Sequence, residues 1–62
     1  MKLTLKQKRF VDEYLVDLNA TEAALRAGYS KRTAYSIGNE NLKKPEVQKE
    51  IQERMKDRQE RT

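Results

Sequence analysis

The apolar residues of this 62-residue chain recur every three or four positions, and no segment alternates apolar with polar residues. A repeat of three to four residues places side chains along one face of an α-helix, whereas a half-buried strand needs a repeat of two. The sequence therefore predicts an all-α fold, a small bundle of about four helices. We expect a single domain over residues 1–62, with helices at about 4–17, 20–27, 31–42 and 45–60.

Residues that start helices stand ahead of these apolar repeats. Thr4 and Gln7 form a capping-box pattern, in which a hydroxyl and a glutamine side chain satisfy free backbone N–H groups. Asn19 and Glu22 are spaced in the same way ahead of the second helix, and Pro45 suits the first turn of the last one. The first helix should bury one stripe of side chains, formed by Phe10, Val11, Tyr14, Leu15 and Leu18.

The segment 20–39 has the pattern of a helix-turn-helix. Gly28 should end the second helix in a left-handed conformation, and Ser30 should cap a third helix from Lys31, so that three residues separate the two helices. A DNA-binding unit of this kind needs a small residue where its helices cross and a glycine four residues later, which Ala24 and Gly28 supply. A helical hairpin that serves only packing is the alternative. Further buried positions are predicted at Ala23, Ala27, Tyr29, Ala34 and Ile37.

The predicted third helix has an apolar face and a polar face. On a helical projection Ala34 and Gly38 fall on the buried side, and polar residues gather on the opposite side. Arginine can bind guanine or phosphate and asparagine can bind adenine, although a merely solvated face would have a similar composition. We predict DNA contacts for Ser30, Lys31, Arg32, Thr33, Tyr35, Ser36, Asn39 and Lys43, and candidate phosphate contacts for Lys6, Lys8, Arg9 and Arg26.

The charge of the chain is distributed unevenly. Residues 1–44 carry nine basic and five acidic residues, whereas residues 45–62 carry five of each, so the net charge of +4 lies in the first part. A basic surface favours a polyanionic partner, because binding to phosphates releases condensed counterions. Many proteins reach this net charge for solubility alone, so the charge supports nucleic-acid binding without establishing it.

The composition excludes several classes of function. The chain has no cysteine and no histidine, which removes thiolate chemistry, imidazole bases and the usual zinc ligands. We therefore predict no catalytic residues, no cofactor and no metal, and we interpret Asp12, Glu13 and Asp17 as part of a solvated helix face. No apolar run approaches the roughly 20 residues of a membrane span and no signal peptide is recognisable, so we expect no membrane association.

Three sequence blocks occur in a specific order and spacing. They are Asn19-Ala20-Thr21, Ala27-Gly28-Tyr29-Ser30 and Lys44-Pro45-Glu46-Val47. Together with the run from Leu5 to Val11, they resemble the N-terminal DNA-binding domain of bacteriophage terminase small subunits. The resemblance covers nearly the whole chain, from about Leu3 to Met55.

The resemblance implies a function in viral genome packaging. Such subunits recognise the packaging initiation site on double-stranded viral DNA, assemble into rings and recruit a large subunit that carries the ATPase and nuclease. We therefore expect a non-enzymatic protein of the host cytoplasm, with the chain being an isolated, monomeric domain that lacks the ring-forming region. In the full-length protein, we expect a homo-oligomer and contact with the large subunit. The alternatives are a helix-turn-helix transcriptional regulator and a protein-binding helical module that uses Val16 and Leu25.

Overall fold

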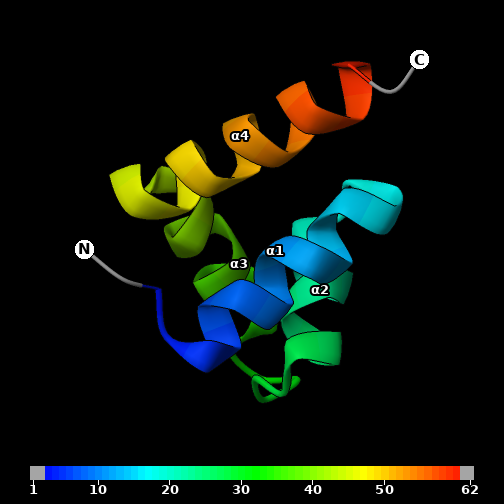
Figure 1. The fold of residues 1–62 in the computed structure, drawn as a ribbon. Helices are drawn as coiled ribbons and strands as arrows, with labels where there is room; N and C mark the ends of the chain where they lie inside the picture. The colour runs from blue at the N-terminus through cyan, green and yellow to red at the C-terminus, as the bar shows by residue number, and fades with distance from the viewer. Residues whose placement is uncertain (1–2, 61–62) are drawn as a thin grey trace.

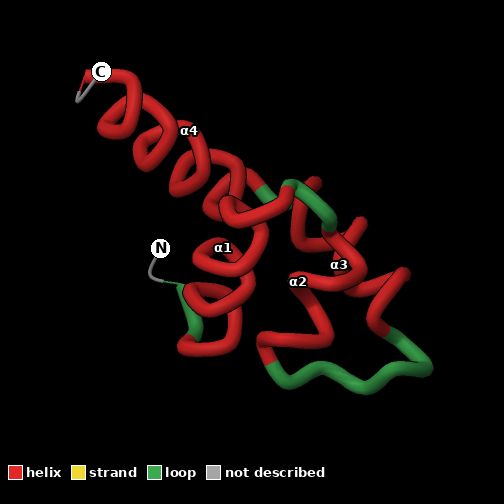
Figure 2. Tube along the Cα trace, turned by 90° about the vertical axis from the view of Figure 1, so that its right-hand side faces the viewer, coloured by secondary structure: helices red, strands yellow, loops and turns green. Residues whose placement is uncertain are grey.

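The computed structural model describes residues 3–60, with side chains as far as residue 56 (Figure 1). It contains four helices, α1 (Leu5–Asp17), α2 (Ala20–Ala27), α3 (Ala34–Lys43) and α4 (Pro45–Glu60), and residues 3–60 include no strand. The prediction of an all-α fold is confirmed. Helix α2 packs between α1 and α3, and α4 begins beside α3 and continues across α1 (Figures 1 and 2).

The starts of α1 and α2 follow from the caps recognised in the sequence. The backbone N–H of Gln7 donates to Thr4 Oγ1 at 3.1 Å, and the backbone N–H of Thr4 donates to Gln7 Oε1 at 2.9 Å. At α2, the backbone N–H of Glu22 donates to Asn19 Oδ1 at 3.1 Å. These bonds satisfy backbone donors that a helix leaves without partners in its first turn, and they fix where both helices begin.

The end of α1 differs from the expected buried stripe at one residue. Phe10 and Val11 are fully buried and Tyr14 and Leu15 pack partly against the core, but Leu18 is 56% exposed. Leu18 ends the helix in the left-handed conformation, at φ 57° and ψ 31°, with its N–H donating to the carbonyl of Tyr14. Because the chain reverses its twist there, Leu18 leaves the stripe, and its prediction as a buried residue is wrong.

The connection between α2 and α3 is longer than predicted. It comprises residues 28–33, and α3 begins at Ala34 instead of Lys31. The hydroxyl of Ser30 accepts from the N–H of Arg32 at 3.2 Å, and the carbonyl of Ser30 accepts from the N–H of Thr33 at 3.0 Å. Ser30 therefore closes a turn of its own and does not cap α3, because serine side chains bond to nearby backbone in turns as readily as at helix starts. The α2–α3 pair is compatible with a helix-turn-helix.

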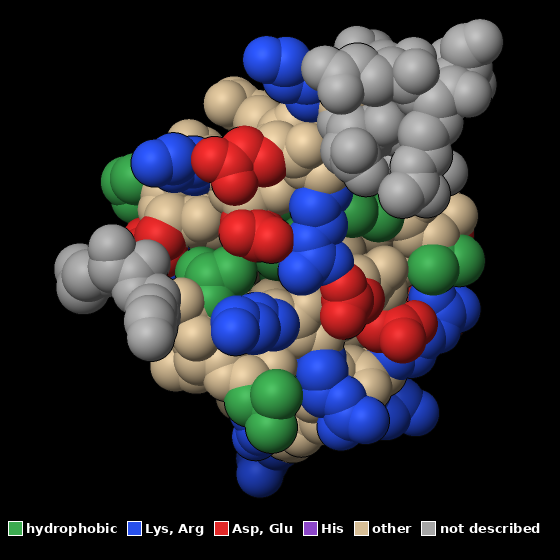
Figure 3. All heavy atoms as spheres, in the orientation of Figure 1, with side chains coloured by type: hydrophobic (Ala, Val, Ile, Leu, Met, Phe, Trp, Pro, Cys, Tyr) green, Lys and Arg blue, Asp and Glu red, His purple; other side chains and the backbone are tan. Residues whose placement is uncertain are grey.

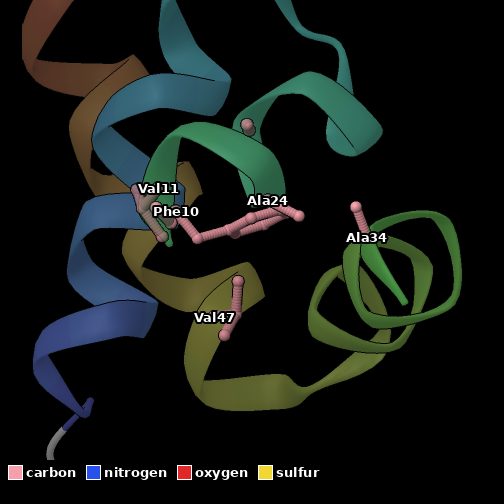
Figure 4. Close-up of a cluster of buried hydrophobic side chains, with 7 residues drawn as sticks. Phe10, Val11, Ala24, Ala34 and Val47 are labelled. Carbon is pink, nitrogen blue, oxygen red and sulfur yellow. The ribbon is translucent and has the colours of Figure 1, made fainter. Parts of the chain in front are cut away.

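Small residues form most of the buried core. The fully buried apolar residues come from all four helices (Figure 4) and are Phe10, Val11, Ala23, Ala24, Ala27, Ala34 and Val47. Three of the four alanines lie on α2, so its backbone can approach α1 and α3 closely. Tyr29 and Ile37, also predicted as buried, are half-buried. Most of the predicted core positions are therefore confirmed, while Val47 is the fully buried contribution of α4.

Val16 and Leu25, which the sequence offered as a surface for a protein partner, have different environments. Leu25 packs partly against the core, whereas Val16 is 73% exposed. Helix α4 therefore leaves Val16 uncovered.

We predict that Gly28→Val lowers the free energy of unfolding by about 1–3 kcal/mol, the usual cost of a strained backbone conformation. Gly28 has φ +105°, and after it the N–H of Tyr29 donates to the carbonyl of Ala24 at 3.0 Å. The nearest atom to an added Cβ, Lys6 Cε at 3.8 Å, leaves room for a side chain, so the cost comes from the backbone alone. Urea denaturation measures it, and Gly28→Asn should cost less because asparagine tolerates this conformation. Equal stability of the wild type and the Gly28→Val variant would contradict the proposed turn.

We also predict that Gly38→Ala destabilises the protein, although alanine is the better helix former by about 1 kcal/mol. A Cβ at Gly38 would lie 2.7 Å from the carbonyl oxygen of Ala20, so α3 or α2 would have to shift. Overpacking of this kind costs about 1–3 kcal/mol, more than the gain in propensity. Thermal denaturation shows whether the Gly38→Ala variant is less stable than the wild type. Ser36→Ala, on the exposed face of α3, is the control and should keep or raise the stability. A Gly38→Ala protein more stable than the wild type would refute the close crossing.

Candidate nucleic-acid interface

The residues predicted to contact DNA lie on the connection before α3 and on the outer face of this helix. Seven of the eight are exposed, and Asn39 is half-buried; the exposed residues are Ser30, Lys31, Arg32, Thr33, Tyr35, Ser36 and Lys43. The opposite face of α3 is buried through Ala34, Gly38 and Asn41. The helical projection therefore separated the two faces correctly, even though the helix begins three residues later than predicted.

Two of these residues also build the connection itself. The hydroxyl and carbonyl of Ser30 hold residues 31–33 in a turn, and the hydroxyl of Thr33 donates to the same carbonyl at 3.3 Å. Thr33 occupies the N-cap position of α3 without making a side-chain cap bond. The turn presents Lys31 and Arg32 between these two residues, and both of their side chains are exposed.

The positive charges on this surface are not neutralised by neighbouring carboxylates. Within residues 3–56, no carboxylate forms an ion pair with Lys31, Arg32 or Lys43. Glu40 is an exposed acid on the same helix. In Figure 3, basic side chains gather at the lower edge, where Figure 1 shows the start of α1 and the α2–α3 connection, while acidic side chains lie higher, over α1 and α4. Such a surface suits a polyanion.

The start of α1 contributes a further positive charge beside the connection. The Nζ atom of Lys6 lies 5.1 Å from the centre of the Tyr29 ring. Arg9 is exposed one turn later, about 60° away from Lys6 on a helical projection. Of these two candidate phosphate contacts, Lys6 therefore lies on the side of α1 that adjoins the connection, and Arg9 is exposed beside it.

Arg26, the third candidate phosphate contact, is engaged within the protein. Its Nη1 atom lies 3.1 Å from Asp17 Oδ2, and its Nε atom lies 4.0 Å from Glu13 Oε1. The hydrogen bond from Arg26, together with the N–H of Asn19, lowers the pKa of Asp17, and the same contact with Asp17 raises the pKa of Arg26. Arg26 thus links α2 to the end of α1, with much of its charge compensated.

Lys8, the fourth candidate, faces a different environment. It lines a shallow groove of about 730 Å³ between the start of α1 and α4, together with Glu46, Glu50 and Glu53. Asp12, one turn further along α1, forms an ion pair with Arg54 of α4. The fold thus divides α1 into one flank that faces α2 and the connection and another that faces α4, and Lys8 belongs to the second.

The structure also assigns a contact to Tyr29, which the sequence predicted only as a buried residue. Its ring lies under Lys6, although the two residues are 23 positions apart in the sequence. No local spacing could have indicated this pair, because it depends on how α1 packs against α2.

The described residues offer no site for a metal ion. They contain no group of three acidic, histidine or cysteine residues that could hold one, and Asp12, Glu13 and Asp17 contact arginines instead. Over the same part of the chain, no helix is both long enough and apolar enough to cross a membrane.

Comparison with known proteins identifies one family. The sequence profile described as terminase small subunit matches residues 3–62. The chain is 53% identical over 57 residues to the terminase small subunit of Bacillus phage SF6, covering 90% of this chain and 39% of that protein. The terminase small subunit of Bacillus phage SPP1 is 53% identical over 55 residues, which cover 87% of this chain and 37% of that protein. The terminase small subunit of Staphylococcus phage 80alpha is 46% identical over 56 residues, which cover 89% of this chain and 38% of that protein. The chain spans about two fifths of the length of these relatives, and the resemblance found in the sequence is confirmed.

We predict that Arg26→Gln raises the pKa of Asp17 towards its ordinary value, as measured by NMR titration of the carboxyl carbon. A lowered pKa in the folded state stabilises the fold above the unfolded pKa of about 3.9, and this stabilisation is lost as the pH falls through the folded-state value. The stability difference between wild type and Arg26→Gln should therefore shrink below about pH 4. Lys8→Gln, on the other flank of α1, is the control and should leave the Asp17 titration unchanged. An unchanged Asp17 pKa in Arg26→Gln would contradict the assigned contact.

Proposed function

We propose that this chain, which belongs to the terminase small subunit family, binds double-stranded DNA through α3 and the connection that precedes it. The observation that carries the proposal is the group of exposed basic residues on this surface, Lys31, Arg32 and Lys43, none of which has a carboxylate partner within residues 3–56. Charges held at one surface and left unpaired are available to phosphates, which bind them with release of counterions.

Helix α3 is suited to act as a recognition helix in a helix-turn-helix. Its inner face is fixed against α2 by Ala34 and Gly38, so the outer face is held in one orientation. A B-DNA major groove about 12 Å wide admits an α-helix of this kind. We assign base contacts to Arg32 and Asn39, since their side chains can form paired hydrogen bonds with guanine and adenine. Lys31, Tyr35, Ser36 and Lys43 would contact the backbone on either side.

We further propose that the DNA is viral and that binding marks the packaging initiation site. Membership of the terminase small subunit family supports this role. In the full-length protein, homo-oligomers would recruit the large subunit, which carries the ATPase and nuclease, in the host cytoplasm. The small subunit itself would be a non-enzymatic recognition component.

A single module of this size should bind DNA weakly. The few phosphate contacts available on one helix and one turn imply an affinity near the non-specific range of about 10⁻⁴ to 10⁻⁶ M. A monomeric domain would then depend on oligomerisation for tight binding, because linked copies bind with a high effective concentration. This expectation agrees with a homo-oligomer in the full-length protein.

The decisive experiment is an NMR titration of the labelled chain with duplex DNA at two salt concentrations. We expect shifts concentrated on the amides of residues 30–43, decreasing as salt rises. Arg32→Ala and Asn39→Ala should each weaken binding by about 1–3 kcal/mol on the recognised sequence, with unchanged helicity by circular dichroism.

Lys8→Gln provides a matched control, because it removes one positive charge from the flank of α1 that faces α4. It should shift the affinity far less than Arg32→Ala. Unaltered binding in both Arg32→Ala and Asn39→Ala would refute the assigned surface. An absence of shifts at low salt would refute DNA binding and favour a protein partner, with the exposed Val16 as the first surface to test.

A further inference from the structure

We propose that Tyr29 is a positioning residue, which holds the ammonium group of Lys6 beside the α2–α3 connection so that α1 contributes a phosphate contact. The inference rests on the proposed DNA binding and extends the contact surface to a second helix. It assigns a role to an aromatic residue outside α3 and selects one of the four candidate phosphate contacts.

The position of Lys6 is defined by two neighbours. Its Nζ atom lies 5.1 Å from the centre of the Tyr29 ring, and its Cε atom lies 3.8 Å from the place that a Cβ on Gly28 would occupy. Within residues 3–56, no carboxylate pairs with this side chain, although it is exposed. Lys6 therefore extends from α1 across the end of α2.

The kind of contact matters for what Lys6 can do. An aromatic ring attracts an ammonium group through its quadrupole and limits the freedom of a flexible side chain. Unlike a carboxylate, the ring carries no net charge, so the positive charge of lysine remains available to a phosphate. Arg26 shows the opposite arrangement, because Asp17 and Glu13 compensate its charge.

The ring itself is held firmly. The N–H of Tyr29 donates to the carbonyl of Ala24 at 3.0 Å, directly after the left-handed Gly28, and the side chain packs against the buried core. Tyr29 directly precedes Ser30, whose hydrogen bonds form the turn with Lys31 and Arg32. The conformation of one turn therefore sets the positions of the basic residues on the connection and, through the ring, of Lys6.

The test measures the salt dependence of binding to a duplex DNA of arbitrary sequence, by fluorescence anisotropy between about 50 and 200 mM salt. Loss of one phosphate contact reduces the slope of log affinity against log salt by about 0.9. For Lys6→Gln we therefore expect the ratio of affinities at these two salt concentrations to fall about threefold. Lys8→Gln, with the same change in net charge, should retain the wild-type slope.

Two substitutions distinguish a role of the Tyr29 ring in positioning Lys6 from a role in the fold alone. Tyr29→Phe keeps the ring and should bind as the wild type does, whereas Tyr29→Leu should weaken binding about two- to fivefold, the range of an exposed cation–π contact. Combined with Lys6→Gln, Tyr29→Leu should cause no further loss. The ring-current shift of the Lys6 side-chain methylenes, read by NMR without DNA, should persist in Tyr29→Phe and vanish in Tyr29→Leu.

Each outcome is decisive for one of the two proposals. If the wild type shows no salt-dependent affinity for duplex DNA, the proposed function itself fails. If the wild type binds but Lys6→Gln keeps its slope, or Tyr29→Phe loses as much as Tyr29→Leu, DNA binding stands and the role of Tyr29 is overturned. Additive losses in the double variant would likewise show that the two side chains act separately.

Discussion

The structure depends on how closely α2 approaches the helices on either side of it. Ala23, Ala24 and Ala27 are buried on this short helix, and their single methyl groups let two neighbouring backbones come near. Interiors are packed to crystal-like density, so such contacts leave little freedom for either helix to rotate. The orientation of α3, and with it the exposure of the basic surface, follows from the packing of α2. A core of mostly small residues, with Phe10 as its one large buried aromatic side chain among the described residues, thus holds the basic surface in place.

The charged side chains at the two ends of α1 make different kinds of contact. Towards its end, Glu13 and Asp17 hold Arg26 of α2, and on the opposite flank Asp12 pairs with Arg54 of α4. The acidic groups of α1 are therefore occupied by arginines within the protein. At its start, the ammonium group of Lys6 lies over an aromatic ring. The basic surface and the internal ion pairs consequently lie at different ends of the same helix.

Local sequence signals predicted the helices well where a cap and an apolar repeat agree, as at Thr4 and Asn19. They failed where one residue has two competing local uses, because Ser30 bonds to its own turn and α3 begins only at Ala34. They also failed at Leu18, whose left-handed backbone removes it from a stripe that its spacing fits. The outer face of α3 could be recognised from periodicity, since the small residues Ala34 and Gly38 mark its inner face, which also buries Asn41. The pair Arg26–Asp17 joins α2 to α1, the pair Lys6–Tyr29 joins α1 to the α2–α3 connection, and both could only be seen in the folded chain.

The close crossing of α3 over the start of α2 has a consequence for how such sequences can diverge. The atoms nearest to a side chain at Gly38 are the carbonyl oxygen and carbon of Ala20, at 2.7 and 3.0 Å, and both belong to the backbone. Every amino acid carries this carbonyl group, so no replacement at position 20 can make room for a larger residue at position 38. At most buried contacts, a larger residue on one side can be compensated by a smaller residue on the other side. Here no substitution at position 20 can compensate a larger residue at position 38. As long as α2 and α3 cross in this way, position 38 is restricted to glycine independently of its neighbours.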